Sequence, residues 1–384
     1  MTEFDQQVAT ERVNLLGLTR DQLENLMVEM GEKPFRARQL MKWIYKRAVS
    51  NFDDMTDLAK SFRQRLALSA EIRVPDVTLR QHSSDGTRKW LLSVDRGVSM
   101  VPQAIEMVYI PEPGRGTLCI SSQVGCAMDC SFCSTAQQGF NRNLGAAEIV
   151  GQVWLANREL LGDAPPSNDT AERLITNVVF MGMGEPLANY RSVVPAAEIL
   201  MDDLGFDISR RRVTVSTSGL VPQMLKLAEE TNCALAVSLH APNDELRNEL
   251  VPINRKHNIA ELLDACWYYL NRQNARSITF EYVMLDGIND QLEHARELVV
   301  LLKHKPAKVN LIPFNPFPDT RYKRSPADVI ERFREYLNNH GVIATTRRTR
   351  GDDIDAACGQ LVGRVQNRTT VRLGSKLMAV AVQA

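Results

Sequence analysis

From about residue 115 onward, short apolar runs alternate with amphipathic helical patterns, and this alternation limits the possible folds more than any other feature. The strand-like runs are TLCISSQV, LITNVVFM, RRVTVST, CALAVSL, SITFEYVML and KVNLIPF. Near-continuous apolar strands, each followed by a helix, predict a parallel sheet covered by helices. The pattern favours a partial, TIM-like (β/α)6 barrel over an open doubly wound sheet. No GxGxxG follows the first strand, which argues against a dinucleotide-binding domain.

The part of the chain before this alternation predicts a small α+β accessory module. Residues 13–70 have helical patterns, and TRDQ at positions 19–22 fits a capping box. Residues 74–110 alternate like strands, and SSDGT supplies a hairpin turn at Asp85 and Gly86. We therefore expect two domains. An accessory module spans residues 1–110, and an α/β barrel with a C-terminal extension spans residues 111–384.

The sequence also suggests a cellular compartment. No apolar run reaches 18 residues and the N-terminal stretch MTEFDQQVATER is polar, so we expect neither a membrane span nor a signal peptide. The expected location is the cytoplasm. In that compartment, seven cysteines are more often reduced, metal-bound or catalytic than paired in structural disulfides.

Overall charge gives no sign of a nucleic-acid partner, because 46 basic residues balance 46 acidic ones. Local charge does. Residues 33–47 hold six basic residues, three aromatics and no acid, and the last 24 residues add further cations without an acid. Basic groups attract phosphates and aromatics stack on bases, so both stretches are candidate RNA-binding surfaces. The alternative for 33–47 is one amphipathic helix with a solvated basic face and its aromatics in the core. The C-terminal cations are Arg364, Arg368, Arg372 and Lys376.

The stretch GCAMDCSFCS carries three cysteines with the spacing CxxxCxxC, at Cys126, Cys130 and Cys133. This spacing also matches one face of a helix, but Gly125 and Asp129 interrupt any apolar helix here. Structural zinc needs four ligands, and no fourth Cys or His lies nearby. Three thiolates on a four-iron cluster leave one iron open to a substrate. We therefore predict that the three cysteines hold an iron–sulfur cluster.

Further polar residues stand where the predicted strands end. Since the ends of barrel strands and the loops after them carry the chemistry in such folds, we expect these residues to form a ring at one mouth of the barrel. With the three cysteines, the ring comprises Gly184, Glu185, Ser216, Ser218, Ser238, His240 and Asn315.

The cysteine motif, with Phe132 before its last cysteine and its place after the first strand of a (β/α) core, resembles the radical S-adenosylmethionine superfamily. This resemblance implies a [4Fe-4S] cluster whose open iron binds S-adenosylmethionine. Electron transfer then cleaves the sulfonium to methionine and a 5′-deoxyadenosyl radical. The stretch FMGMGEPLANY resembles the glycine-rich segment that holds the amino group of the cofactor. On the same resemblance, the cofactor-binding residues are Gly184, Glu185, Ser216, Ser238, Leu239, His240 and Asn315.

A longer set of motifs narrows the resemblance. TLCISSQVGCAMDCSFCSTAQQGFNRNL, MGMGEP, SLHAPND, VPIN and TRGDDIDAACGQL are similar to the RlmN-type ribosomal RNA adenine methyltransferases. The likeness runs from EKPFRARQ nearly to the end of the chain. It implies methylation of carbon-2 of an adenosine in the peptidyl-transferase loop of 23S rRNA, and of the adenosine 3′ of the anticodon in some tRNAs.

The same resemblance implies a chemical route. Carbon-2 of adenine is electron-poor and cannot attack a methyl sulfonium. Instead Cys358 takes a methyl group as a thiolate. A radical formed from a second S-adenosylmethionine then activates that methyl group for addition to carbon-2. Glu106 accepts the carbon-2 proton, and Cys119 releases the product by forming a disulfide with Cys358. The route consumes two S-adenosylmethionine molecules and needs a one-electron reductant such as a flavodoxin. We expect the protein to act as a monomer.

Alternatives remain open from sequence alone. A lone cysteine such as Cys358 is usually a small buried hydrophobe, as we expect for Cys233 and Cys266. The Cfr-type relatives methylate carbon-8 of the same rRNA adenosine by the same steps. A radical enzyme acting on a peptide or small molecule, and a three-cysteine metal or redox module without catalysis, are more distant alternatives. The sequence assigns no role to Asp352, Asp353 and Asp355.

Overall fold

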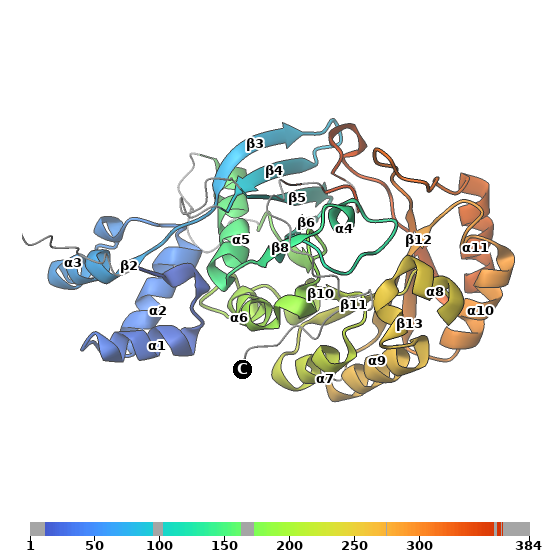
Figure 1. Ribbon diagram of the computed structural model, residues 1–384. Helices are drawn as coiled ribbons and strands as arrows, with labels where there is room; N and C mark the ends of the chain where they lie inside the picture. The colour runs from blue at the N-terminus through green and yellow to red at the C-terminus, as the bar shows by residue number, and fades with distance from the viewer. Residues whose placement is uncertain are drawn as a thin grey trace, which may run out of the picture.

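The computed structural model describes residues 12–94, 103–162, 173–273, 275–356, 359–361 and 363. Cys358 and the C-terminal cations Arg364, Arg368, Arg372 and Lys376 lie outside the described residues. Within them, a ten-stranded sheet organises the barrel part of the chain, and a helical module precedes it (Figure 1).

The barrel strands run parallel in the sheet order β6, β9, β10, β11, β12, β13, β14. Six of them correspond to the predicted strands, which confirms the predicted partial (β/α) barrel. The seventh, β14, is a short strand after the predicted set. Their bounds are β6 (Arg115–Cys119), β9 (Asn177–Phe180), β10 (Val213–Thr217), β11 (Ala234–Ser238), β12 (Ile278–Met284), β13 (Ala307–Pro313) and β14 (Ile343–Thr346).

Helices follow these strands along the chain and cover the outer face of the curved sheet (Figure 1). Their apolar sides supply much of the buried core, for example Ile149 and Val153 of α5 and Leu262 of α9. The covering helices are α5 (Ala146–Leu161), α6 (Tyr190–Met201), α7 (Val221–Glu230), α9 (Ile259–Gln273), α10 (Leu292–Leu302) and α11 (Ala327–Asn339). The short helix α8 (Asp244–Leu250) lies instead at the C-terminal ends of β10 and β11. No helix in the described part of the chain has the length and hydropathy to traverse a bilayer.

Three antiparallel strands extend the same sheet beyond β6: β5 (Ala104–Glu112), β4 (Arg88–Ser93) and β3 (Asp76–His82). The predicted turn joins β3 to β4, where the Ser83 amide donates to the Thr87 carbonyl at 2.8 Å. The sheet thus runs continuously across the boundary predicted at residue 110, and that domain boundary stays a prediction.

The helical module comes before these strands. The predicted capping box is present at α1, since the Thr19 side chain accepts from the Gln22 amide and Gln22 caps Thr19 in return. The indole of Trp154 on α5 donates to the Ile44 carbonyl at 2.8 Å and so ties the module to the barrel. The module contains β1 (Val13–Asn14), η1 (Leu15–Gly17), α1 (Arg20–Glu29), α2 (Phe35–Met41), η2 (Lys42–Lys46), η3 (Phe52–Asp54), α3 (Lys60–Ser69) and β2 (Ala70–Glu71).

Shorter elements shape the loops of the barrel. They are β7 (Gln123–Gly125), α4 (Ser134–Gln137), β8 (Phe140–Asn143), η4 (Pro186–Asn189), η5 (Arg210–Arg212), η6 (Pro252–Arg255) and η7 (Asp352–Ile354). The loop from β7 to β8 carries the three clustered cysteines, and η7 lies just before Cys358 in the chain.

Candidate active site

A cavity of about 170 Å³ opens where the parallel strands end. It is lined by the cysteine loop and by residues at or after the C-terminal ends of β9 to β13. The ring of polar residues predicted from the strand ends lines this one cavity, as expected from their positions. The ring members are Cys126, Cys130, Cys133, Gly184, Glu185, Ser216, Ser218, Ser238, His240 and Asn315.

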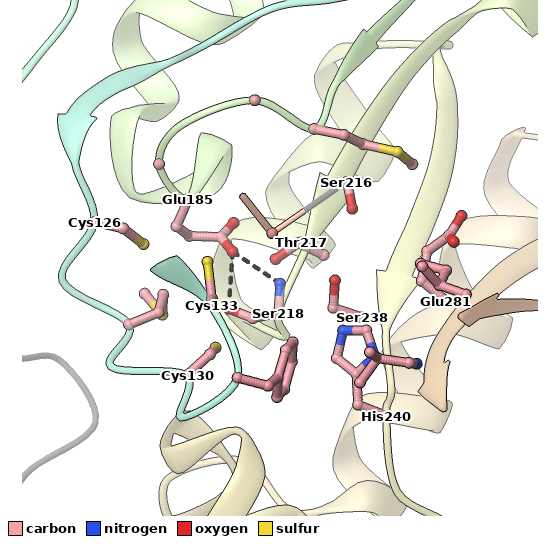
Figure 2. A pocket seen from close by; sticks show the side chains of 18 of the residues that line it. Cys126, Cys130, Cys133, Glu185, Ser216, Thr217, Ser218, Ser238, His240 and Glu281 are labelled. Carbon is pink, nitrogen blue, oxygen red and sulfur yellow. Dashed lines mark hydrogen bonds between the residues drawn. The ribbon is translucent and has the colours of Figure 1, made fainter. Parts of the chain in front are cut away.

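The cysteine loop is held in shape by its backbone. Gly125 has a φ of +78°, and a Cβ there would lie 1.9 Å from the Gly139 carbonyl oxygen, so only glycine fits. The Cys126 amide donates to that carbonyl at 2.9 Å and the Cys133 amide donates to the Cys130 carbonyl at 3.2 Å. Figure 2 shows the three cysteine side chains gathered on one side of the cavity.

Burial of these thiols and repulsion between their charged forms both disfavour the thiolates. Burial raises the pKa of Cys126 and of Cys130, and the neighbouring cysteines raise both further. Deprotonating all three thiols therefore needs a compensating positive charge. Bound iron provides one.

Glu185 lies near the C-terminal end of the glycine-rich stretch MGMGEP, which follows β9. Its Oε2 accepts from the amide and the hydroxyl of Ser218, both at 2.8 Å, and its Oε1 accepts from the Leu187 amide at 3.0 Å (Figure 2). Burial raises the pKa of Glu185, while these hydrogen bonds lower it. Gly184 has a φ of +102°, and a Cβ there would lie 2.5 Å from the Gln123 side chain. The stretch is therefore held close against β7.

His240 is a buried, neutral ring in the cavity wall. Burial, with the nearby Arg247 cation, lowers the pKa of His240 to about 3. Its Nδ1 accepts from the Val283 amide at 3.0 Å, so the ring proton resides on Nε2. This ring and the ring of Phe132 in the cysteine loop pack edge to face, with ring centroids 4.7 Å apart.

Arg247 of α8 is fully buried beside the C-terminal ends of β10 and β11. Its guanidinium donates to the carbonyls of Ser218 (2.7 Å), Ser238 (3.0 Å) and Leu239 (3.0 Å), and to the side chain of Asn254 (2.8 Å). One side chain thus joins the ends of β10 and β11. Sequence reasoning missed this residue, because an arginine in the polar helix DELRNEL has the pattern of a solvated one.

The remaining predicted cofactor residues differ in position. Ser216 and Ser238 line the cavity from β10 and β11, and the buried Asn315 accepts from Arg324 at 2.6 Å through its Oδ1. Leu239 does not line the cavity. Its side chain packs in the core, and its carbonyl accepts from Arg247. The roles of these residues in cofactor binding stay predictions.

The structure describes two of the three predicted catalytic residues, Cys119 and Glu106. Cys119 is buried at the C-terminal end of β6, the strand that leads into the cysteine loop. Glu106 is buried on β5, and its carboxylate lies 3.4 Å from the ammonium group of Lys89. Cys358 lies outside the described residues, but Gly359, which follows it, lines the cavity. The Gly359 carbonyl accepts from the Ser134 amide, one residue after Cys133, at 2.9 Å.

Two charged residues of the cavity wall were not predicted. Glu281 is buried on β12, burial raises its pKa, and its Oε2 accepts from Asn310 at 2.7 Å. A lone carboxylate inside the apolar run SITFEYVML was a visible signal. Arg347 follows β14, a strand that the sequence pattern did not show. Cys233 and Cys266 are buried in the core, as expected.

The basic stretch 33–47 combines both interpretations given for it. Trp43 and Tyr45 are buried, as the amphipathic-helix alternative predicts. Phe35, in contrast, is 46% exposed, with the guanidinium of Arg36 4.9 Å from its ring centroid. One aromatic of this stretch therefore remains available for stacking.

The residues of the cysteine loop fit an iron–sulfur cluster. Their three thiols stand on one loop at one side of the cavity (Figure 2), and thiolates are the usual ligands of such clusters. The shared cavity beside the thiols, lined by hydroxyl, amide and carboxylate groups, has room for a polar ligand of the open iron.

Comparison with known proteins agrees with this geometry. Residues 13–72 match the model of the ribosomal RNA large subunit methyltransferase N-terminal domain, and residues 120–299 match that of the radical SAM superfamily. A radical SAM domain implies a [4Fe-4S] cluster and S-adenosylmethionine. In structure, the chain resembles a radical SAM methyltransferase from Sphaerobacter thermophilus with a TM-score of 0.82. The two are 43% identical, over 91% of this chain and 99% of that one.

Two curated relatives are more similar in sequence, and both are named dual-specificity RNA methyltransferase RlmN. The protein from Alkalilimnicola ehrlichii is 58% identical over 93% of this chain and 96% of its own length. The protein from Marinobacter nauticus is 56% identical over 94% of this chain and 95% of its own length. The chain therefore belongs to the RlmN family of dual-specificity RNA methyltransferases, within the radical S-adenosylmethionine superfamily.

Proposed function

We propose that this protein methylates carbon-2 of an adenosine in the peptidyl-transferase loop of 23S rRNA, and of the adenosine 3′ of the anticodon in some tRNAs. One observation carries the proposal: Gly359, the residue after Cys358, lines the cavity that also holds the three clustered cysteines. A methyl group on Cys358 and a radical generated at the cluster would then meet in one place. This is what methylation of an electron-poor carbon requires.

The predicted site residues divide the work of this proposal among them. Cys126, Cys130 and Cys133 hold the cluster, and S-adenosylmethionine occupies the cavity beside them. Gly184 and Glu185 bind its amino group, while the remaining contacts to its ribose, carboxylate and adenine come from Ser216, Ser238, His240 and Asn315. Leu239, which does not line the cavity, supports the loop between Ser238 and His240 from the core. Arg247 donates to the carbonyls of Ser218, Ser238 and Leu239 and so keeps these loops in register.

The first half of the reaction is a displacement. The Cys358 thiolate attacks the methyl group of one S-adenosylmethionine, and S-adenosylhomocysteine leaves. For the second half, the bound cluster and a second S-adenosylmethionine supply the radical that removes a hydrogen atom from this methyl group. The carbon held on Cys358 then adds to carbon-2 of the adenine. The ring would then pass one electron back to the oxidised cluster and its carbon-2 proton to the Glu106 carboxylate.

Cys119 completes the cycle. Its thiolate attacks the sulfur of Cys358, the carbon–sulfur bond breaks toward the base, and the carbon takes a proton to become the methyl group of the product. A Cys119–Cys358 disulfide remains and is reduced before the next cycle. The proposal includes two molecules of S-adenosylmethionine per methylation, a flavodoxin-like electron donor, a monomeric enzyme and a cytoplasmic location.

We also propose that the accessory module, residues 1–110, contacts the RNA substrate. The exposed Phe35 and the cations around it support this role, because stacking and phosphate contacts are the usual means of binding single-stranded RNA. Binding of a 23S rRNA fragment to the full chain should then weaken steeply as salt rises. An enzyme acting on a peptide would bind that fragment weakly at every salt concentration.

The central test is mass spectrometry of Cys358. After incubation of the cluster-loaded protein with S-adenosylmethionine, we expect one methyl group on the peptide that carries Cys358. An unmodified peptide would refute the mechanism. The Cys119→Ala variant should accumulate protein joined covalently to RNA, and the Cys358→Ala variant should transfer no methyl group while keeping its cluster.

Nucleoside mass spectrometry against 2-methyl and 8-methyl adenosine standards identifies the modified carbon, and the 8-methyl product would instead support the Cfr-type reaction.

A further inference from the structure

The chain just before Cys358 is docked on the turn between β3 and β4. We call residues 350–356 the docked segment and residues 83–87 the hairpin turn. The Gly351 amide donates to Asp85 Oδ2 at 3.1 Å, and Arg350 lies 3.8 Å from the same oxygen. The Ser84 amide donates to Asp353 Oδ2 at 3.1 Å. Segments more than 260 residues apart in sequence are thus joined by hydrogen bonds.

The backbone of the docked segment is folded tightly against this turn. Gly351 has a φ of +62°, and a Cβ there would lie 2.9 Å from the Thr87 side chain and 2.8 Å from that of Ala356. The Ala356 amide donates back to the Gly351 carbonyl at 3.0 Å. Asp355 also has a positive φ, of 48°, which is uncommon for any residue other than glycine. A contact from the surrounding structure must therefore hold Asp355 in this conformation.

Lys89 makes the innermost contact of the docked segment. Its ammonium group donates to the Asp355 carbonyl at 3.2 Å and lies 3.4 Å from Glu106 Oε1. Both side chains are buried, with 7% of Lys89 and 9% of Glu106 exposed. They are diagonal neighbours on one face of the β4–β5 pair, because Lys89 stands opposite Val108 and Leu91 opposite Glu106. One cation therefore joins the carboxylate on β5 to the main chain that leads to Cys358.

A fold has little reason to keep such a pair for stability alone. Desolvating a lysine and a glutamate costs about as much as their attraction returns, and apolar residues often replace buried pairs without loss.

Glu106 is also linked to the cavity. Its carbonyl accepts from Ser121 Oγ at 2.6 Å, and that oxygen accepts from the Met183 amide of the glycine-rich stretch at 2.8 Å.

We propose that Lys89 is a positioning residue for methyl transfer, a role that rests on the function proposed above. It holds the Glu106 carboxylate and the Asp355 carbonyl in a fixed relation, so that the proton acceptor and the chain bearing the methyl group reach the same adenine. A residue three positions after a fixed point can lie no more than about 11 Å from it. Fixing Asp355 therefore limits the reach of the methyl carrier from one side, and the Gly359 contact with Ser134 limits it from the other.

The test compares Lys89→Met, Lys89→Gln and Lys89→Arg with the native chain and with Lys308→Met, an exposed lysine on β13. Thermal midpoint and iron content check the fold. The readouts are methyl occupancy of Cys358, RNA adduct yield in the Cys119→Ala background, and molecules of 5′-deoxyadenosine formed per methylated adenosine. We expect Lys89→Met to keep its cluster and to form 5′-deoxyadenosine. Adduct yield should fall by roughly 10- to 100-fold, as expected for misplaced reacting groups.

The other variants separate positioning from folding. Lys89→Arg keeps the charge and the donors and should recover most of the adduct yield, whereas Lys308→Met should behave as native. If Lys89→Met does not fold, Lys89→Gln keeps a donor without the charge and should show the same uncoupling. A folded Lys89→Met or Lys89→Gln chain with native coupling would overturn the proposal, and so would a loss that follows iron content alone. If the native chain does not methylate Cys358 and the Cys119→Ala chain forms no RNA adduct, the proposed function fails instead.

Discussion

Two parts of the active site are built in different ways, and the contrast shows where the enzyme is rigid. The cofactor wall, formed by the ends of β9, β10 and β11, is tied together by the buried side chains of Glu185 and Arg247. Their partners are mostly backbone groups of the loops that line the cavity. The docked segment at residues 350–356 is instead fastened at its tip by exposed or half-buried side chains such as Asp353 and Arg350.

The difference has an energetic meaning. A hydrogen bond to a buried charge contributes strongly, because breaking it leaves a charge without water or a partner. A contact between solvated groups contributes little. The wall should therefore be present before any ligand binds, whereas the segment leading to Cys358 should be able to release its outer contacts at small cost. This suits the two-step role that we propose for Cys358.

The largest effect should come from removing the buried guanidinium of the wall. Arg247→Met leaves the carbonyls of Ser218, Ser238 and Leu239 without their donor. Each buried carbonyl left unsatisfied costs about 1 to 3 kcal/mol, so we expect the free energy of unfolding, measured by urea denaturation, to fall by about 3 to 5 kcal/mol. Arg334→Met, at an exposed ion pair on α11, is the control and should change it by less than about 0.5 kcal/mol. A change below about 1 kcal/mol at Arg247 would mean that the wall holds without it.

The second effect concerns how His240, in the same wall, makes the free energy of unfolding depend on pH. The pKa of His240 is lowered to about 3 by burial and by Arg247, below the value of about 6.5 for an unfolded chain. Between these values the unfolded chain binds the proton more readily. The contribution of His240 to stability is therefore complete above pH 6.5 and is lost as pH falls toward 3.

At pH 5 this loss amounts to about 2 kcal/mol relative to neutral pH. His240→Asn keeps an acceptor for the Val283 amide and should remove that part of the slope, as measured by urea denaturation at pH 7 and pH 5. His82→Asn, at an exposed position on β3, should leave the slope as in the native protein. An unchanged slope in the His240→Asn variant would show that this ring is not neutral in the folded chain.

Sequence patterns predicted the wall far better than the docked segment, for a physical reason. Residues such as Glu185 and Ser216 stand at or after the C-terminal ends of apolar parallel strands, and a parallel sheet brings those ends to one edge. Arg247 and Lys89 act through distant carbonyls, and no sequence period announces such a partner. The docked segment lies before Cys358, yet only the structure assigns Asp353 and the Asp355 carbonyl to the β3–β4 region.

The third effect concerns docking itself. Gly351→Ala places a Cβ 2.8 Å from Ala356 and 2.9 Å from Thr87, at a φ of +62°. The left-handed conformation alone costs an L-residue about 1 to 2 kcal/mol. Because the cost falls on the docked segment, we expect methyl transfer to fall by roughly tenfold while the thermal midpoint of the barrel is unchanged. Gly341→Ala, with a φ of +85° and no atom within 4 Å, is the matched control for strain alone. If both variants lost methyl transfer equally, the loss would come from backbone strain, and docking of the segment would not be needed for activity.

The smallest effect should come from the outermost contact of the docked segment. Asp353 is exposed, and its carboxylate accepts from the Ser84 amide at 3.1 Å. Hydrogen bonds from Ser83 and Ser84 lower the pKa of Asp353. Because water replaces such a contact readily, Asp353→Ala should change methyl transfer by no more than about twofold. Asp85→Ala removes the acceptor of the Gly351 amide and should reduce transfer more. If Asp353→Ala instead matched Lys89→Met in uncoupling radical formation from methylation, the tip of the segment would be as rigid as the wall, and the contrast between the two regions would not hold.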